Sequence, residues 1–102
     1  MKTKTLDKTS ILEELKDLKP RLAKFGVSEL GLFGSYVRNE QNEESDIDIL
    51  IDFDPKKKSF DNFMVIYDLL EESFSGEKVE VLTRKGLSPY LGPNILETVE
   101  YV

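Results

Sequence analysis

Two aspartates stand at alternate positions of one short segment, and a Gly–Ser pair precedes them. Asp46 and Asp48 open an apolar run, and ten residues separate them from Gly34 and Ser35. Aspartate is depleted from strands, and carboxylates resist burial unless they are paired or bound to a metal. A divalent cation held by oxygen ligands would satisfy such a pair. Glycine allows close approach of a backbone, and a serine that starts a helix offers a hydroxyl and exposed N–H groups to a phosphate.

A third acidic residue, Glu80, lies in a later segment that alternates between apolar and polar residues. Side chains of a strand point alternately to its two faces, so Asp46 and Asp48 share one face. If the apolar faces of the two strands coincide, Glu80 lies on the same side as the aspartates. Three carboxylates together repel one another and raise the pKa of at least one of them. Carboxylates and substrate phosphates together are the usual environment of magnesium, and two such ions can serve phosphoryl chemistry.

The same residues also have simpler explanations. Asp46 and Asp48 alone would fit a solvated strand face whose charges deter edge pairing. Ser35 would fit a helix N-cap, and Arg38 fits a phosphate contact and a structural ion pair equally well. The combination with Glu80 favours a metal and phosphate site.

Composition limits the other kinds of chemistry. The 102 residues include no cysteine and no histidine, which excludes disulfides, thiolate metal sites and histidine-based triads. A formal net charge of −6 gives no basic stripe for a nucleic-acid backbone. No apolar run is long enough for a membrane span, and the first residues lack the apolar core of a signal peptide. We therefore expect a cytoplasmic protein that binds neither membrane nor nucleic acid directly.

Apolar spacing predicts a first helix from about residue 11 to residue 25. Ser10 and Glu13 match a capping box, and Gly26 is the expected C-terminal cap. Pro20 falls inside the pattern and is expected to bend the helix or divide it in two.

Three strands and two further helical segments are expected after it. The strands are predicted at 30–33, 46–53 and 78–83, and the tail at about 87–99 is expected to be an interrupted helix. Ser59 is expected to cap a helix that buries one face, formed by Phe60, Phe63, Met64, Tyr67, Leu70 and Phe74.

The connections predict how these strands are arranged. A helix joins the second strand to the third, which is typical of a right-handed parallel crossover. An antiparallel first strand would bring Gly34 and Ser35 to the edge where the acidic residues lie. The expected fold is α+β: a small mixed sheet of about three strands packed with helices, in one domain over residues 1–102.

With these motifs the sequence resembles the nucleotidyltransferase superfamily of DNA polymerase β. The signature is Gly-Ser, a spacer, Asp-x-Asp and a third carboxylate on a later strand. Within the superfamily the chain looks like the minimal nucleotidyltransferases (MNT type). The likeness runs through "LGLFGSYVRNEQNEESDIDILIDF", "GEKVEVLTRKGL" and "ILETVEYV", and it implies a polymerase β-like nucleotidyltransferase fold.

The resemblance implies transfer of AMP from magnesium-bound ATP to an acceptor hydroxyl, with pyrophosphate as the leaving group. In MNT antitoxins the acceptor is typically a tyrosine of an all-helical HEPN toxin, so the expected assembly is a hetero-oligomer of antitoxin and toxin. The 102 residues contain no counterpart of the helical domain that many nucleotidyltransferases use to hold an acceptor, so we expect a partner protein to hold it and a small-molecule acceptor is disfavoured. The alternative function is a catalytically weak module that neutralises the toxin by occlusion.

The family roles carry over to individual residues. Asp46, Asp48 and Glu80 match the catalytic metal ligands, and Glu80 would also help to deprotonate the acceptor. The nucleotide phosphates would bind at Gly34, Ser35 and Arg38. The third carboxylate is more usually aspartate, and the family often carries glycine at the position of Asn39.

Overall fold

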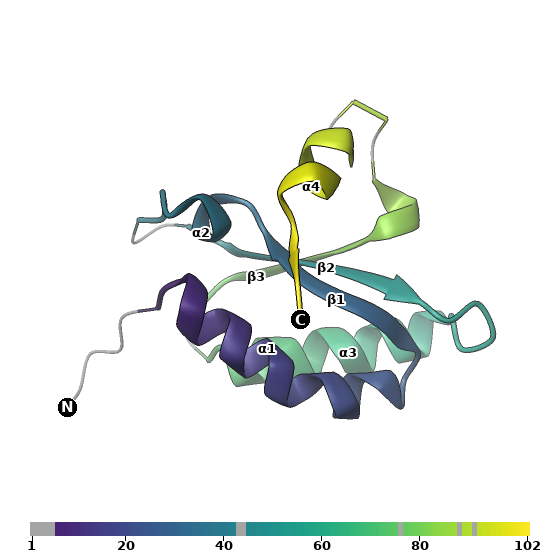
Figure 1. Ribbon diagram of the computed structural model, residues 1–102. Helices are drawn as coiled ribbons and strands as arrows, with labels where there is room; N and C mark the ends of the chain where they lie inside the picture. The colour runs from purple at the N-terminus through teal and green to yellow at the C-terminus, as the bar shows by residue number, and fades with distance from the viewer. Residues whose placement is uncertain (1–5, 43–44, 76, 88, 91) are drawn as a thin grey trace.

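The computed structural model describes residues 6–42, 45–75, 77–87, 89–90 and 92–102. They form a four-stranded sheet in the order β3-β2-β1-β4, flanked by helices (Figure 1). The elements in chain order are α1 (Lys8–Ala23), β1 (Val27–Phe33), α2 (Ser35–Arg38), β2 (Ile47–Phe53), α3 (Phe60–Ser73), β3 (Val79–Thr83), a short 3-10 helix η1 (Arg84–Gly86), α4 (Gly92–Thr98) and β4 (Glu100–Tyr101). The α+β class and the mixed sheet are confirmed, but the sheet has four strands where about three were expected.

Strand directions follow the prediction. β1 and β2 are antiparallel, with Phe33 opposite Asp48. β2 and β3 are parallel, with Asp48 beside Glu80, and α3 makes the crossover between them (Figure 1). The end of β1 and the starts of β2 and β3 therefore lie at one edge of the sheet.

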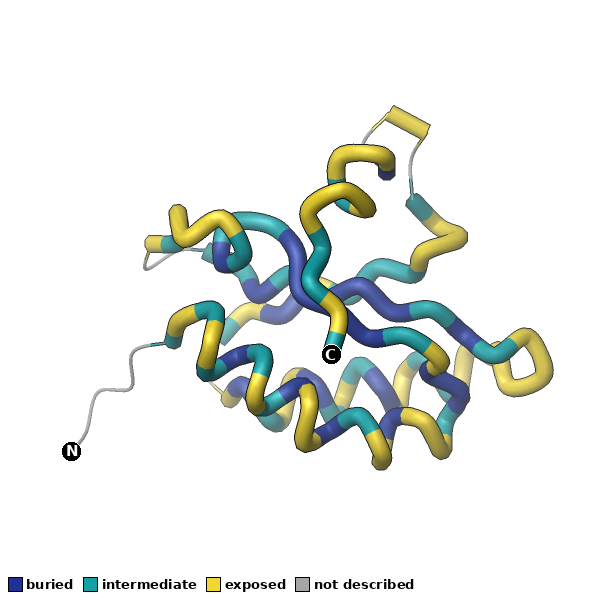
Figure 2. Tube along the Cα trace, viewed as in Figure 1, coloured by how far each residue is buried: buried dark blue, intermediate teal, exposed yellow. Residues whose placement is uncertain are grey.

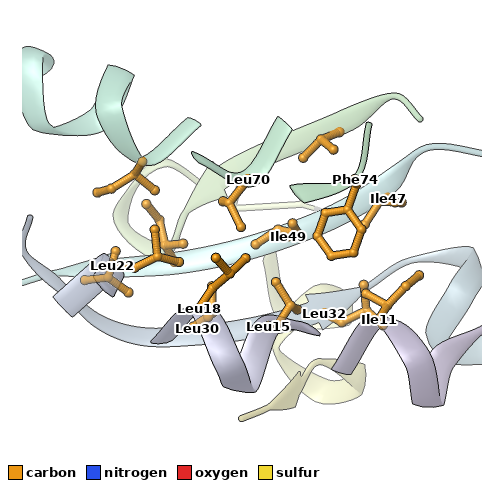
Figure 3. Close-up of a cluster of buried hydrophobic side chains, with 14 of the residues drawn as sticks. Ile11, Leu15, Leu18, Leu22, Leu30, Leu32, Ile47, Ile49, Leu70 and Phe74 are labelled. Atoms are coloured by element: carbon orange, nitrogen blue, oxygen red, sulfur yellow. The ribbon is translucent and has the colours of Figure 1, made fainter. Parts of the chain in front are cut away.

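The hydrophobic core lies between one sheet face and the helices α1 and α3. Both helices lie on the same side of the sheet, and α4 lies on the other (Figure 1). Alternate β2 residues, from Ile47 to Phe53, are buried and belong to the cluster shown in Figure 3. Fully burying side chains of this kind contributes about 1.5–3 kcal/mol each. In Figure 2 the strands β1 and β2 are mostly buried, whereas α4 is mostly exposed.

The first helix differs from the prediction at its start and in its middle. The capping box is formed one turn earlier, because the Ser10 N–H donates to Asp7 Oδ1 at 2.8 Å and the Asp7 N–H donates to Ser10 Oγ at 3.1 Å. The helix also runs unbroken through Pro20. Pro20 lies one turn from the helix end on an exposed side, where water can bond the carbonyl group that its missing N–H leaves free.

The helix ends at Ala23 with Lys24 as the C-cap, so Gly26 is not the cap. Gly26 instead lies in the turn into β1 with a φ of 108°.

Ser59 caps α3 as predicted, because its hydroxyl accepts from the Asn62 N–H at 3.0 Å. The buried face, however, is formed by Ile66, Leu70 and Phe74. Phe60 is 76% exposed and Met64 is 37% exposed, so assigning them to the core was wrong. The spacing of four residues between the buried positions defines the stripe better than aromatic content does.

The C-terminal segment is more structured than the predicted broken helix. After η1 the chain forms α4, and β4 then pairs with β1 through Gly31 and Leu32. A side chain at position 31 would meet Val99 Cγ2 at 2.7 Å, so glycine allows the last strand to pack closely. Among the described residues, no helix combines the length and the hydropathy that a membrane span requires.

Candidate active site

Asp48 and Glu80 lie side by side on neighbouring parallel strands. They are paired in the β2–β3 register, and their side chains are within hydrogen-bond reach of each other. Both project from the face opposite the core, because Ile47, Ile49 and Val79 are the buried neighbours in sequence. The predicted convergence of acidic side chains from two strands is therefore present for this pair.

The pair perturbs the acidity of Asp48. Partial burial, the hydrogen bond with Glu80 and the negative charges of Glu80 and Asp46 raise the pKa of Asp48 to about 7, and Arg38 opposes this shift. In the native structure the charged form of Asp48 is therefore disfavoured relative to an ordinary aspartate. A cation in the same place would supply the missing positive charge.

Gly34 brings the backbone into contact with this carboxyl group. Its φ of 84° lies in the left-handed region, which is strained for residues with a side chain. A Cβ atom there would lie 3.0 Å from Asp48 Cγ and would overlap Oδ2. Glycine is therefore required both by the turn and by the position of Asp48.

The short helix α2 begins at Ser35, directly after Gly34. Ser35 is half-buried and directly follows Gly34, the residue whose backbone contacts Asp48. The helix ends at Asn39, which has a φ of 59°. Asparagine tolerates this conformation better than most residues, which explains how it can stand where the family often carries glycine.

Arg38 is exposed and forms an ion pair with Glu40, with 2.9 Å between Nε and Oε1. This contact agrees with the interpretation of Arg38 as one partner of a structural ion pair. The charge of Arg38 nevertheless acts on Asp48, so the guanidinium lies close enough to influence an anion at the site.

Asp46 lies one residue before β2, and its charge reaches Asp48. Among the described residues, however, no group of three or more acidic side chains is arranged to hold a metal ion. The donor set still fits magnesium, because Asp48 and Glu80 are paired carboxyl groups whose proximity and partial burial raise the pKa of Asp48. Asp48 and Glu80 would hold the ion, and Asp46 would join them.

No motif of the sequence points to the α4 side of this region. Asn94 and Ile95 of α4 line a pocket together with Gly34 and Arg38. The periodicity of the tail predicted a helix but gave no indication of which sheet face it would cover.

Comparisons with known proteins agree with this architecture. A family model described as "Nucleotidyltransferase domain" matches residues 8–102. The "Putative protein adenylyltransferase MJ1379" of Methanocaldococcus jannaschii is 39% identical over 104 residues that span all of both chains. The "Protein adenylyltransferase MntA" of Thermococcus cleftensis is 39% identical over 87 residues, covering 85% of this chain and 83% of the relative.

Solved structures share the fold. A "putative minimal nucleotidyltransferase" superposes with a TM-score of 0.80 at 23% identity, covering 96% of this chain and 98% of the other. A mutant MntA-HpeT toxin-antitoxin structure gives a TM-score of 0.61 at 19% identity, covering 94% and 71%. A toxin-antitoxin structure with AMP-PNP gives 0.54 at 21% identity, covering 94% and 72%.

Proposed function

This chain belongs to the nucleotidyltransferase family, and on that premise we propose that it transfers AMP from magnesium-bound ATP to a hydroxyl group of a partner toxin. The acceptor is a tyrosine, and the toxin is an all-helical protein of the HEPN type. The names of the relatives support protein as the acceptor, and the toxin-antitoxin structures, one of them with AMP-PNP, support the partner and the nucleotide. The observation that carries the proposal is the Asp48–Glu80 pair beside the Gly34 turn.

Each residue of the site has a role in this reaction. Asp48 and Glu80, joined by Asp46, hold magnesium, which when bound offsets the negative charge of the reacting phosphates. The Ser35 hydroxyl and the backbone after Gly34 bind phosphate oxygens, and Arg38 adds a positive charge nearby.

The transfer requires no reactant other than ATP and the tyrosine. The tyrosine oxygen forms a bond to the α-phosphorus of ATP, and the bond from that phosphorus to the bridging oxygen of pyrophosphate breaks. The proton of the tyrosine hydroxyl passes to the carboxylate of Glu80, which is exposed and can reach an incoming group. AMP is then joined to the toxin, and pyrophosphate leaves.

Occlusion of the toxin without chemistry is the second candidate function. Two observations favour it: glutamate stands at position 80 where aspartate is more usual, and the described residues hold no ready three-carboxylate cluster. The longer side chain of Glu80 would hold a metal ion at a different distance from its strand than aspartate would, and transfer would then be slow.

Labelled ATP separates the two functions. We expect α-labelled ATP, magnesium and the wild-type chain to place label on a tyrosine of the HEPN partner, because the proposed step leaves the α-phosphate on the acceptor. The label is located by digestion and mass spectrometry, with EDTA as the control. A toxin that is silenced while no label appears on it would establish occlusion instead.

Substitution of Gly34 by alanine tests the turn. We expect Gly34→Ala to lower the affinity for magnesium–ATP by at least about tenfold, because the new methyl group would displace the Asp48 carboxyl. The positive φ would also cost about 1–2 kcal/mol of stability. Isothermal titration calorimetry and thermal melts measure the two effects.

Gly26→Ala is the matched control. Gly26 also has a positive φ, but it lies at the other end of β1. The control should lose stability and keep nucleotide affinity. Equal loss of affinity in both variants would contradict the role of Gly34.

A further inference from the structure

A pocket of about 320 Å³ lies next to the candidate active site. Its walls are formed by Phe33, Gly34 and Arg38 together with Asn94, Ile95, Glu97 and Thr98 of α4. The helix α4 lies on the side of the sheet away from α1 and α3 (Figure 1). We call this cavity the α4 pocket. Gly34 belongs both to this pocket and to the turn that contacts Asp48, so the two regions are continuous.

We propose that the α4 pocket holds the nucleoside half of the nucleoside triphosphate, and that Asn94 and Ile95 determine which base is accepted. This proposal rests on the proposed function, because it takes the phosphates to lie at Gly34 and the carboxyl pair. A ligand with its α-phosphate there carries its sugar and base into the adjoining space. The volume is at the lower end of small-molecule pockets, which begin at about 300 Å³.

The charges around the pocket orient the ligand. Arg38 lies on the side of Gly34, whereas Glu97 adds a negative charge on the side of α4. A triphosphate is repelled by Glu97 and attracted by Arg38, so the phosphates lie toward the turn and the uncharged nucleoside lies toward α4. The Glu97 carboxylate can then accept a hydrogen bond from a ribose hydroxyl, as acidic residues do in other nucleotide sites.

The α4 residues supply a surface for the base and a polar group for its edge. Ile95 is half-buried, and Phe33 is buried, so together they offer an apolar surface to the flat ring. The Thr98 hydroxyl donates to the backbone oxygens of Asn94 and Ile95, at 3.1 and 3.4 Å. Asn94 is exposed, and its carboxamide can donate and accept hydrogen bonds. A carboxamide matches the adjacent donor and acceptor of adenine.

Binding titrations with three ligands test the assignment. We expect Ile95→Ala to weaken magnesium–ATP binding about tenfold through lost apolar contact and to leave magnesium–tripolyphosphate binding unchanged. We expect Asn94→Asp to lower the ratio of ATP to GTP affinity about tenfold, because aspartate accepts but does not donate. Leu96→Ala is the matched control, since Leu96 is 38% exposed on the same helix and does not line the pocket.

The outcomes separate the pocket from the transfer reaction. Ile95→Ala that weakens ATP no more than Leu96→Ala overturns the proposal, even if the wild type labels its partner. The proposal is also overturned if Ile95→Ala or Asn94→Asp keeps its affinity for ATP but loses affinity for the toxin, because the pocket would then hold part of the partner. ATP affinity that depends on Ile95 and Asn94 supports the pocket, and if no label is transferred it contradicts only the proposed transfer.

Discussion

Replacing Asp48 by asparagine is expected to lower the rate of AMP transfer by about 1,000-fold. Asp48 is the residue on which the other features of the site converge: it is paired with Glu80, contacted by Gly34, and affected by the charges of Asp46 and Arg38. Asparagine keeps the size of the side chain and removes the negative charge that a cation needs. The initial rate of label transfer from α-labelled ATP to the partner measures the effect.

Asp52→Asn is the control for this substitution. Asp52 is a half-buried aspartate on the same strand and the same face, four residues further along, and its carboxylate accepts from the Phe53 N–H at 3.0 Å. Its transfer rate should stay close to that of the wild type. Near-normal transfer by Asp48→Asn would show that this carboxylate does not carry the chemistry.

The same Asp48→Asn substitution is expected to stabilise the metal-free protein at pH 8 by about 1–2 kcal/mol. Asp48 has a pKa of about 7 in the native state, above its ordinary 3.8. Between these two values the native state holds more protons than the unfolded state, so native stability falls as the pH rises. The loss of native stability that Asp48 causes is complete above about pH 7 and absent below about pH 4. Solvent screening keeps it modest, because the side chain is only half-buried.

Urea unfolding in EDTA at pH 4, 6 and 8 measures this effect. In EDTA the stability gained by Asp48→Asn should grow with pH. In a second set of unfolding curves, with magnesium–ATP in place of EDTA, the wild type should be stabilised and the variant should not. A gain that does not depend on pH would mean that repacking, not charge, separates the two proteins. Groups that destabilise the free protein and are stabilised by a bound ligand are typical of functional sites.

Much of the fold can be predicted from the sequence, because strong patterns agree with one another. The alternation from Ile47 to Phe53 gives the core face of β2, and the helix between β2 and β3 gives their parallel direction. These two inferences are enough to place Glu80 on the same sheet face as Asp46 and Asp48, and the register of the structure pairs it with Asp48. The site pair therefore follows from periodicity and connection length.

The elements that were missed depend on tertiary contacts. β4 has two residues, too few for a period to be visible, and it is held by pairing with β1 and by the ion pair between Lys8 and Glu100 at 2.8 Å. Pro20 is tolerated because its position near the helix end is solvent-exposed, which the local sequence does not reveal. The α4 pocket was missed for a related reason: its walls are distant in sequence, and only the packing of α4 on the sheet brings them together.

The most direct test of the account is the magnesium dependence of ATP binding, measured by calorimetry on the wild type, Asp48→Asn and Glu80→Gln. The carboxyl pair is predicted to bind the nucleotide through a divalent cation. The wild type should therefore bind ATP with magnesium and not with EDTA, and both variants should lose most of that magnesium-dependent affinity. Binding of ATP that is equally strong in EDTA, or unchanged in both variants, would contradict the account.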